Sequence, residues 1–286
     1  MGPGAVDVDI DPERPGLFTR PDYYDVLRRL RQESPVHAYA PHRWAVARYE
    51  DVRAVSRDPA RFCSGQGVLM HDPKRDGNEL PGSILHMDPP RHAEWRKVAS
   101  RWFTPRAVAR LEERAREIVR SALDRVDPSV RIDLVDAVTA PIPVAVIAEL
   151  LGIGDASDAD LRRWSDACIE SPDDDPSGDD VLANMAAVGE LLEHLNAHVV
   201  ARRAEPRDDL LSVLVEASVE GRPMRDEEIV MYCMSVLVAG NETTRHLLSG
   251  TVEALARHPD QRAALVADAD PAVRSTAVEE CLRWVT

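Results

Sequence analysis

The chain is organised around one stretch, residues 226 to 257, which reads DEEIVMYCMSVLVAGNETTRHLLSGTVEALAR. Apolar residues recur three and four positions apart along it, and further apolar residues fill the opposite side of the helical wheel. A helix that is apolar all round is buried, and 32 residues at 1.5 Å each would extend over about 48 Å. The stretch therefore predicts one long helix that crosses the core of a mainly α-helical protein.

Polar and flexible residues interrupt the middle of this helix, at Ala239-Gly240-Asn241-Glu242-Thr243-Thr244-Arg245. A glycine inside a helix costs about 1 kcal/mol, and a mid-helix acid in a buried setting is costly unless it is paired or hydrated. Threonine hydroxyls can bond back to the preceding turn, and glycine lets another group approach the backbone closely. The residues alone leave two interpretations open: a kinked core helix with an exposed polar patch, or a helix that accommodates a ligand.

The composition is that of an ordinary globular protein, with 286 residues of which 44% are apolar. The formal net charge of -15 argues against a general nucleic-acid-binding protein, which needs a basic surface. Four cysteines without CxxC spacing indicate neither a zinc site nor a disulfide framework. We expect a single domain over residues 1–286.

Residues 1 to 20 are acidic and rich in proline and glycine, so we expect a flexible N-terminal segment. No signal peptide and no run long enough to span a bilayer is visible in the sequence. These features predict a cytoplasmic protein with no membrane partner.

Hydrophobic periodicity predicts a small β-sheet near the N-terminus of an otherwise helical chain. The strands of this sheet are expected at residues 36–39 and 43–49. A separate short strand is expected at residues 131–134. A loop rich in glycine, proline and aspartate is expected from residue 57 to 86. Further helices are expected at residues 23–34, 50–56, 105–126, 142–151, 159–170, 181–204, 210–220, 260–267 and 271–285, and one begins after Pro90.

A second motif, HMDPPRHAEWRK at residues 86 to 97, places two cations on one helix face. His92 and Arg96 lie four residues apart, and they repel one another unless an anion sits against both. A carboxylate or phosphate ligand is one interpretation of this pair. A solvated basic face is the other.

A third motif, Glu280-Cys281-Leu282-Arg283, lies in the last predicted helix. A glutamate and an arginine three residues apart commonly form a surface pair worth a few tenths of a kcal/mol. Because Val278 and Trp284 flank this motif, we expect Glu280 and Arg283 to face inward as a buried pair.

The acidic segment SPDDDPSGDD, residues 171 to 180, raises two metal-binding alternatives. An EF-hand loop fails because Asn184 stands where a bidentate glutamate is required, and Pro176 stiffens the loop. The Mg²⁺ site of an all-helical diphosphate lyase would need a second Asn-x-x-x-Ser-x-x-x-Glu cluster, and from Asn241 onward the pattern is broken. We therefore expect an exposed turn between two helices.

Taken in order, the Asp-Pro-Pro-x-His-x-x-x-Arg, Ala-Gly-x-Glu-Thr-Thr and Glu-x-x-Arg motifs resemble those of the cytochrome P-450 superfamily, the haem-thiolate monooxygenases. The resemblance covers essentially all of the chain. It implies a mainly α, P-450-like fold with a small N-terminal β-sheet. It also implies heme b (iron protoporphyrin IX) as cofactor, O₂ as co-substrate, and electrons from NAD(P)H through a redox partner.

The resemblance carries roles to individual residues of this sequence. The haem propionates would be held by His92 and Arg96. Protons would reach bound oxygen through Glu242 and Thr243, in space left by Gly240. The expected haem-binding residues are His92, Arg96, Ala239, Gly240 and Thr243, and the structural pair is Glu280 and Arg283.

Partners and substrate are implied in the same way. Residues 91 to 110 carry six basic side chains and one acidic one in an otherwise acidic chain, so a ferredoxin-type electron donor is expected there. A solvated basic face remains the alternative beyond Arg101. The loop 57–86 would border the substrate pocket and the turn 171–180 would belong to its lid. A small organic substrate, such as a lipid, sterol or secondary metabolite, is expected.

The iron-ligating cysteine of the family follows the Glu-x-x-Arg helix in a Phe-x-x-Gly-x-x-x-Cys-x-Gly loop. Cys63 lacks the preceding phenylalanine and glycine, and Cys168, Cys233 and Cys281 lie in helical patterns. We therefore expect a C-terminally truncated fragment that is inactive alone, with its axial cysteine beyond Thr286 and no metal ligand within the chain. The alternative is a non-catalytic remnant.

Overall fold

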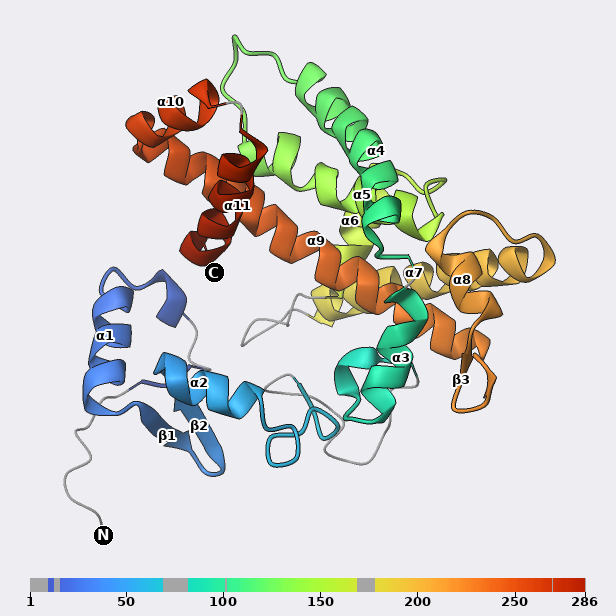
Figure 1. Ribbon diagram of the computed structural model, residues 1–286, viewed down its shortest axis with the longest axis horizontal. Coiled ribbons are helices and arrows are strands. Elements are labelled where there is room, and N and C mark those ends of the chain that lie inside the picture. The colour runs from blue at the N-terminus through green and yellow to red at the C-terminus, as the bar shows by residue number, and fades with distance from the viewer. Residues whose placement is uncertain are drawn as a thin grey trace. The chain divides into compact units, whose positions relative to one another are not determined.

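A computed structural model describes residues 10–12, 16–68, 82–100, 102–168, 178–268 and 270–285. Contacts divide the chain into two compact units. The first comprises Met1–Leu80 and Leu85–His92, and the second comprises Pro81–Ile84 and Ala93–Thr286. The fold is mainly helical with a small sheet, as predicted (Figure 1).

The first unit holds an antiparallel two-stranded sheet between two short helices. Its elements are η1 (Leu17–Thr19), α1 (Tyr23–Glu33), β1 (Val36–Ala40), β2 (Arg43–Val46) and α2 (Tyr49–Ser56). Ile10 and Leu17 are buried against Val26 and Leu30 of α1. The expected flexible N-terminal segment is therefore wrong at these positions, because two of its apolar side chains complete this small core.

The second unit is a bundle of helices. After η3 (Ile84–His86) come α3 (Arg91–Ser100), α4 (Pro105–Asp124), the π-helical turn η4 (Val135–Thr139), α5 (Pro141–Leu151), α6 (Asp158–Ala167), α7 (Gly178–Ala204) and α8 (Leu210–Glu216). They are followed by the hairpin β3 (Ser218–Val219) and β4 (Arg222–Pro223), then α9 (Asp226–Arg257), α10 (Pro259–Ala267) and α11 (Pro271–Val285).

The long helix α9 has the bounds that its apolar pattern predicts, and it runs through the second unit (Figure 1). It packs against α5 and α7, and α11 lies beside its C-terminal half. Its buried residues end at Asn241, so the expectation of burial along the whole helix holds only for the N-terminal half. The later turns are half-buried or exposed.

Glu228 anchors the start of α9, where its side chain is fully buried. The carboxylate accepts hydrogen bonds from the Arg225 backbone N–H at 2.9 Å and from Arg222 at 2.7 and 2.8 Å. Glu228 thus supplies the carboxylate half of a capping box, reinforced by the guanidinium groups of Arg222 and Arg225. Hydrogen bonds from Arg222 hold the pKa of Glu228 at about 2, well below its ordinary value.

Two local features differ from the sequence-based expectations. Residues 131–133 form no strand; instead the Asp133 carboxylate accepts the backbone N–H groups of Val135 and Asp136 and starts a helical turn. The expected helix over residues 210–220 ends at Glu216, because Glu220 and Gly221 adopt positive φ and form the turn of a short hairpin. Two-residue strands are too short to show alternation.

The acidic turn and part of the long loop lie outside the described residues, except that residues 178–180 begin α7. Among the helices that the structure describes, none is long and apolar enough to span a bilayer.

Candidate functional site

The midpoint of α9 presents an exposed face that carries Ala239, Thr243 and His246. These residues are four and three positions apart and so share one side of the helix. The Thr243 hydroxyl donates a hydrogen bond to the Ala239 carbonyl oxygen at 2.7 Å. We call Ala239, Thr243 and His246 the α9 face. Because this hydrogen bond satisfies the Thr243 hydroxyl within its own helix, a polar residue can lie at mid-helix without interrupting the helix.

Glu242 borders the α9 face and is paired. Its Oε1 lies 3.3 Å from His246 Nε2 and 3.5 Å from Arg245 Nη2. Arg245 in turn donates a hydrogen bond to Asp166 of α6 at 2.9 Å. The mid-helix acid is thus compensated by two neighbours on its own helix, one of which ties α9 to α6.

Asn241 makes a second tie between the same two helices. Its side chain is buried, and Nδ2 lies 2.7 Å from the Ser165 hydroxyl on α6. The sequence analysis gave no role to Asn241 or to its α6 partner. The sequence did contain a sign of this contact. Asn241 is a lone amide on the buried side of an apolar helix, and a buried amide requires a hydrogen-bond partner.

Gly240 faces α5. A Cβ at this position would lie 2.6 Å from Ile147 Cδ1, so the missing side chain allows α5 and α9 to pack closely. The space expected for oxygen at Gly240 is therefore occupied by Ile147. This part of the expectation is corrected: close helix packing explains the glycine here.

The second motif starts α3 and fixes the end of the preceding loop. The Asp88 carboxylate accepts the backbone N–H groups of Ser64 and Gly65 at 2.7 and 3.0 Å. The motif therefore has a second role: through Asp88 it fixes the part of the long loop that contains Ser64 and Gly65.

His92 and Arg96 lie one turn apart on α3, with His92 half-buried and Arg96 exposed. Within the part of the chain that the structure describes, neither side chain forms an ion pair or a side-chain hydrogen bond. Burial raises the pKa of Tyr232 on α9, and the charge of Arg96 partly opposes that shift. Arg96 is therefore near enough to the N-terminal half of α9 to act electrostatically on it.

Glu280 and Arg283 do pair, with bidentate contacts at 2.6 and 2.7 Å. Their side chains are 58% and 64% exposed, so the expected inward orientation is wrong. Neighbouring Val278 and Trp284 are exposed as well. The apolar flanks that suggested burial face outward because α11 contacts α9 elsewhere, for example through Val285 at Gly250.

The basic segment is described in part. Lys97 and Arg96 are exposed, whereas Arg91 is half-buried. Arg101 and the side chains of Arg106 and Arg110 lie outside the described residues.

All four cysteines are free thiols. Burial raises the pKa of Cys168 to about 11 and that of Cys233 to about 12. A metal-ligating thiolate requires the opposite shift. Cys63 is exposed and Cys281 half-buried, and neither lies on α9.

An apolar groove of about 670 Å³ lies between α9, α10 and α11. Its first lining residue, Ala254, is eleven positions beyond Thr243, or about 16 Å along the helix. The groove therefore lies apart from the α9 face, and we assign no chemistry to it.

Comparison with known proteins shows the family. The Cytochrome P450 family model matches residues 183–282. Erythromycin C-12 hydroxylase of Saccharopolyspora erythraea is 39% identical over 95% of this chain and 67% of its own length. Methyl-branched lipid omega-hydroxylase of Mycobacterium tuberculosis is 35% identical over 85% of this chain.

A solved Mycobacterium marinum cytochrome P450 in complex with pseudoionone matches with a TM-score of 0.84 at 30% identity, over 96% of this chain and 70% of that one. The chain spans 57% of the length of the M. tuberculosis relative and about two thirds of the other two proteins. The sequence identity and the shared fold point to the same family as the three motifs in the sequence. The chain belongs to the cytochrome P450 family of haem-dependent monooxygenases.

Proposed function

We propose that the protein carrying these residues inserts one atom of O₂ into an organic substrate, and that the α9 face is turned toward the haem and bound oxygen. The observation that carries this proposal is the exposed face at the midpoint of α9, directly beside the end of its buried N-terminal half. Ala239 and Thr243 are exposed there, while Asn241, two positions from each, is buried.

The described residues fit a haem group. Ala239 offers a small side chain, and the Thr243 hydroxyl is turned back onto its own helix, so a flat ring can approach the α9 face. Among the described residues, no acidic side chain forms an ion pair with His92 or Arg96, so both side chains are free to bind two propionates. Bound haem supplies the reductive activation of O₂, whereas the residues of this chain hold the group and deliver protons.

Proton delivery follows the side chains around Thr243. His246 is 62% exposed and contacts the Glu242 carboxylate, so protons from solvent can reach Glu242. Glu242 can then pass a proton toward the side of the helix where the Thr243 hydroxyl lies, one position further along the chain. The hydroxyl both donates and accepts, so it can hold the proton near bound oxygen.

The substrate class follows from the relatives. One is named for erythromycin and another for methyl-branched lipids. We propose that the substrate is a similarly large and mainly apolar molecule, such as a macrolide or a branched lipid.

The function is tested with the haem-loaded protein, a ferredoxin and its reductase, and isotopically heavy O₂. A panel of macrolide and branched-lipid substrates should yield a product that contains one heavy oxygen atom, observed by mass spectrometry. Consumption of electrons without labelled product from any of them would contradict the proposed monooxygenase. Absence of haem binding would favour the non-catalytic alternative.

The electron donor is proposed to be a ferredoxin-type protein, powered by NAD(P)H, that docks on the exposed cations of α3. Lys97→Glu should slow reduction by ferredoxin, and the difference from wild type should shrink at high salt. Arg262→Glu makes the same charge change at an exposed position on α10. An equal loss in both variants would exclude a specific site on α3.

A further inference from the structure

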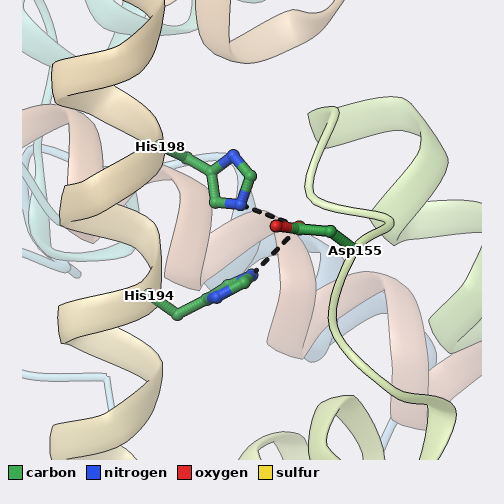
Figure 2. Close-up of side chains that lie close together, drawn as sticks. All are labelled: Asp155, His194 and His198. Carbon is green, nitrogen blue, oxygen red and sulfur yellow. Dashed lines mark ion pairs between the residues drawn. The ribbon is translucent and has the colours of Figure 1, made fainter.

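Three side chains that could bind a metal converge in the second unit, apart from the α9 face. Asp155 lies in the turn between α5 and α6, and His194 and His198 lie one turn apart on α7. Figure 2 shows both imidazole rings turned toward the Asp155 carboxylate. His194 and His198 are 19% and 14% exposed, whereas Asp155 is 66% exposed.

The distances match those of a coordination sphere. Asp155 Oδ1 lies 2.9 Å from His198 Nε2 and 3.6 Å from His194 Nε2, and the three ligand atoms lie within 4.8 Å of one another. Ligand atoms at about 2.0 to 2.1 Å from one tetrahedral Zn²⁺ are separated by about 3.3 Å. Small side-chain movements would therefore bring all three atoms onto one ion.

One of these nitrogens also lacks a hydrogen bond. His194 Nε2 is buried, is aimed at Asp155 and has no hydrogen-bond partner among the described residues. A buried polar atom without a partner is costly, and each such atom requires an explanation. A bound cation would satisfy it.

The surroundings hold the ligands in place, and the described part of the chain supplies no fourth ligand. Trp164 packs on His194 with ring centroids 5.1 Å apart, and the two histidine rings lie 4.6 Å apart. Glu190, one turn before His194, is already bound by Arg163 and by the Trp164 indole N–H. A cleft of about 500 Å³ borders Asp155 and His198, so water can complete the coordination sphere.

The ligand types select the metal. Two imidazoles and one carboxylate suit zinc and its late first-row neighbours, whereas Ca²⁺ and Mg²⁺ prefer oxygen ligands. A His-x-x-x-His pair on one helix face is also the geometry of the His-Glu-x-x-His zinc enzymes, but the buried Leu195 stands in place of their glutamate base. Nothing in this arrangement provides a base for hydrolysis.

We propose that Asp155, His194 and His198 bind one Zn²⁺ or a similar divalent ion, which clamps the turn before α6 onto α7. The site has a structural role and is independent of haem. The sequence analysis missed it because Asp155 lies 39 residues from His194 and because only cysteine spacing was weighed for zinc.

The test uses the 286-residue chain carrying Cys63→Ser, since that exposed thiol can also bind zinc. After removal of metal with a chelator, titration calorimetry with ZnCl₂ should show one saturable site, and zinc should raise the melting temperature. Bound Co²⁺ should give a tetrahedral or five-coordinate absorption spectrum without thiolate charge-transfer bands.

Asp155→Asn and His198→Gln should each weaken zinc affinity at least about tenfold, because even second-shell changes typically cost 10- to 100-fold. Asp155 is exposed, so its variant should keep the helix content of wild type, which circular dichroism checks. His258→Gln, at an exposed histidine between α9 and α10, should bind zinc as wild type does. No saturable binding, equal affinity in the two ligand variants and wild type, or preference for Ca²⁺ would overturn the proposal.

Discussion

Arg202 and Asp209 form a buried ion pair, with Nε 2.6 Å from Oδ2 and only 3% and 6% of the two side chains exposed. Arg202 also donates to the Gly152 carbonyl at 2.7 Å. The other oxygen of Asp209 accepts the Ser212 backbone N–H and hydroxyl at 2.8 and 2.7 Å. These bonds join the end of α5, the end of α7 and the start of α8, and they compensate both buried charges.

Arg202→Met should lower the free energy of unfolding by about 3 to 5 kcal/mol, because it leaves Asp209 buried without its counter-charge. Urea denaturation of the purified chain measures the change. Arg202→Met with Asp209→Asn should recover part of the loss, since no unpaired charge then remains. Arg283→Ala, which breaks an exposed pair, serves as the control and should leave the urea midpoint near that of wild type. Equal losses in Arg202→Met and Arg283→Ala would contradict this account.

Glu228→Gln should destabilise the chain at neutral pH, because it removes the buried carboxylate that binds Arg222 and Arg225. The native pKa of about 2 against an ordinary value of 4.5 corresponds to roughly 3 kcal/mol, an upper value since Arg222 is partly exposed.

The pKa of Glu228 is lowered in the folded state, so its stabilisation is fully present above the ordinary value of 4.5 and is lost as pH falls toward 2. The difference in unfolding free energy between wild type and Glu228→Gln should therefore shrink from pH 5 to pH 2, within about that window. Urea unfolding at several pH values measures it. If the difference in unfolding free energy did not change with pH, the charge of Glu228 would not be what stabilises the start of α9.

In the catalytically active protein that carries these residues, Thr243→Ala should keep haem binding but divert electrons from product to peroxide, because the hydroxyl proposed to deliver the proton is lost. The ratio of product to NAD(P)H consumed, together with peroxide release, measures this. Thr244→Ala is the matched control, since Thr244 is half-buried next to the α9 face. Unchanged coupling in Thr243→Ala would remove the proposed role.

His92→Gln with Arg96→Gln should lower haem content per folded chain, since two propionates would lose charge-assisted bonds worth about 1.5 to 3 kcal/mol each. Haem absorbance relative to protein, with helix content by circular dichroism, separates haem loss from unfolding. Lys97→Gln changes a neighbouring exposed cation and should retain haem. Full haem content in the double variant would refute the assignment.

The 286-residue chain supplied with haem should show no thiolate-type band in its reduced CO difference spectrum. Burial raises the pKa of Cys168 and Cys233, which disfavours their thiolates. Cys63 lacks the phenylalanine and glycine expected before the iron ligand, and Cys281 lies within helix α11. A thiolate-type band that disappears in one cysteine-to-serine variant would identify an iron ligand among these four residues.

Elements whose signal is local could be predicted from the amino-acid sequence. The spacing of apolar residues in α9, the acids of its first turn and the proline after it predicted both ends of the helix. The order of three short motifs predicted the family. Helix α11 and the N-terminal hairpin follow from the same kind of signal, because repeat period and turn residues act over a few positions.

Local sequence signals did not predict which charged groups are buried or which distant residues are in contact, because tertiary packing sets both. Glu280 and Arg283, flanked by apolar side chains, are exposed, whereas Arg202 and Asp209, in an unremarkable polar stretch, are buried. Gly240 packs against Ile147 of α5. Asp155, in the turn before α6, lies 3.6 Å from His194 of α7. Burial and contact depend on which distant element packs over a residue, and the periodicity of a single segment carries no information about that element.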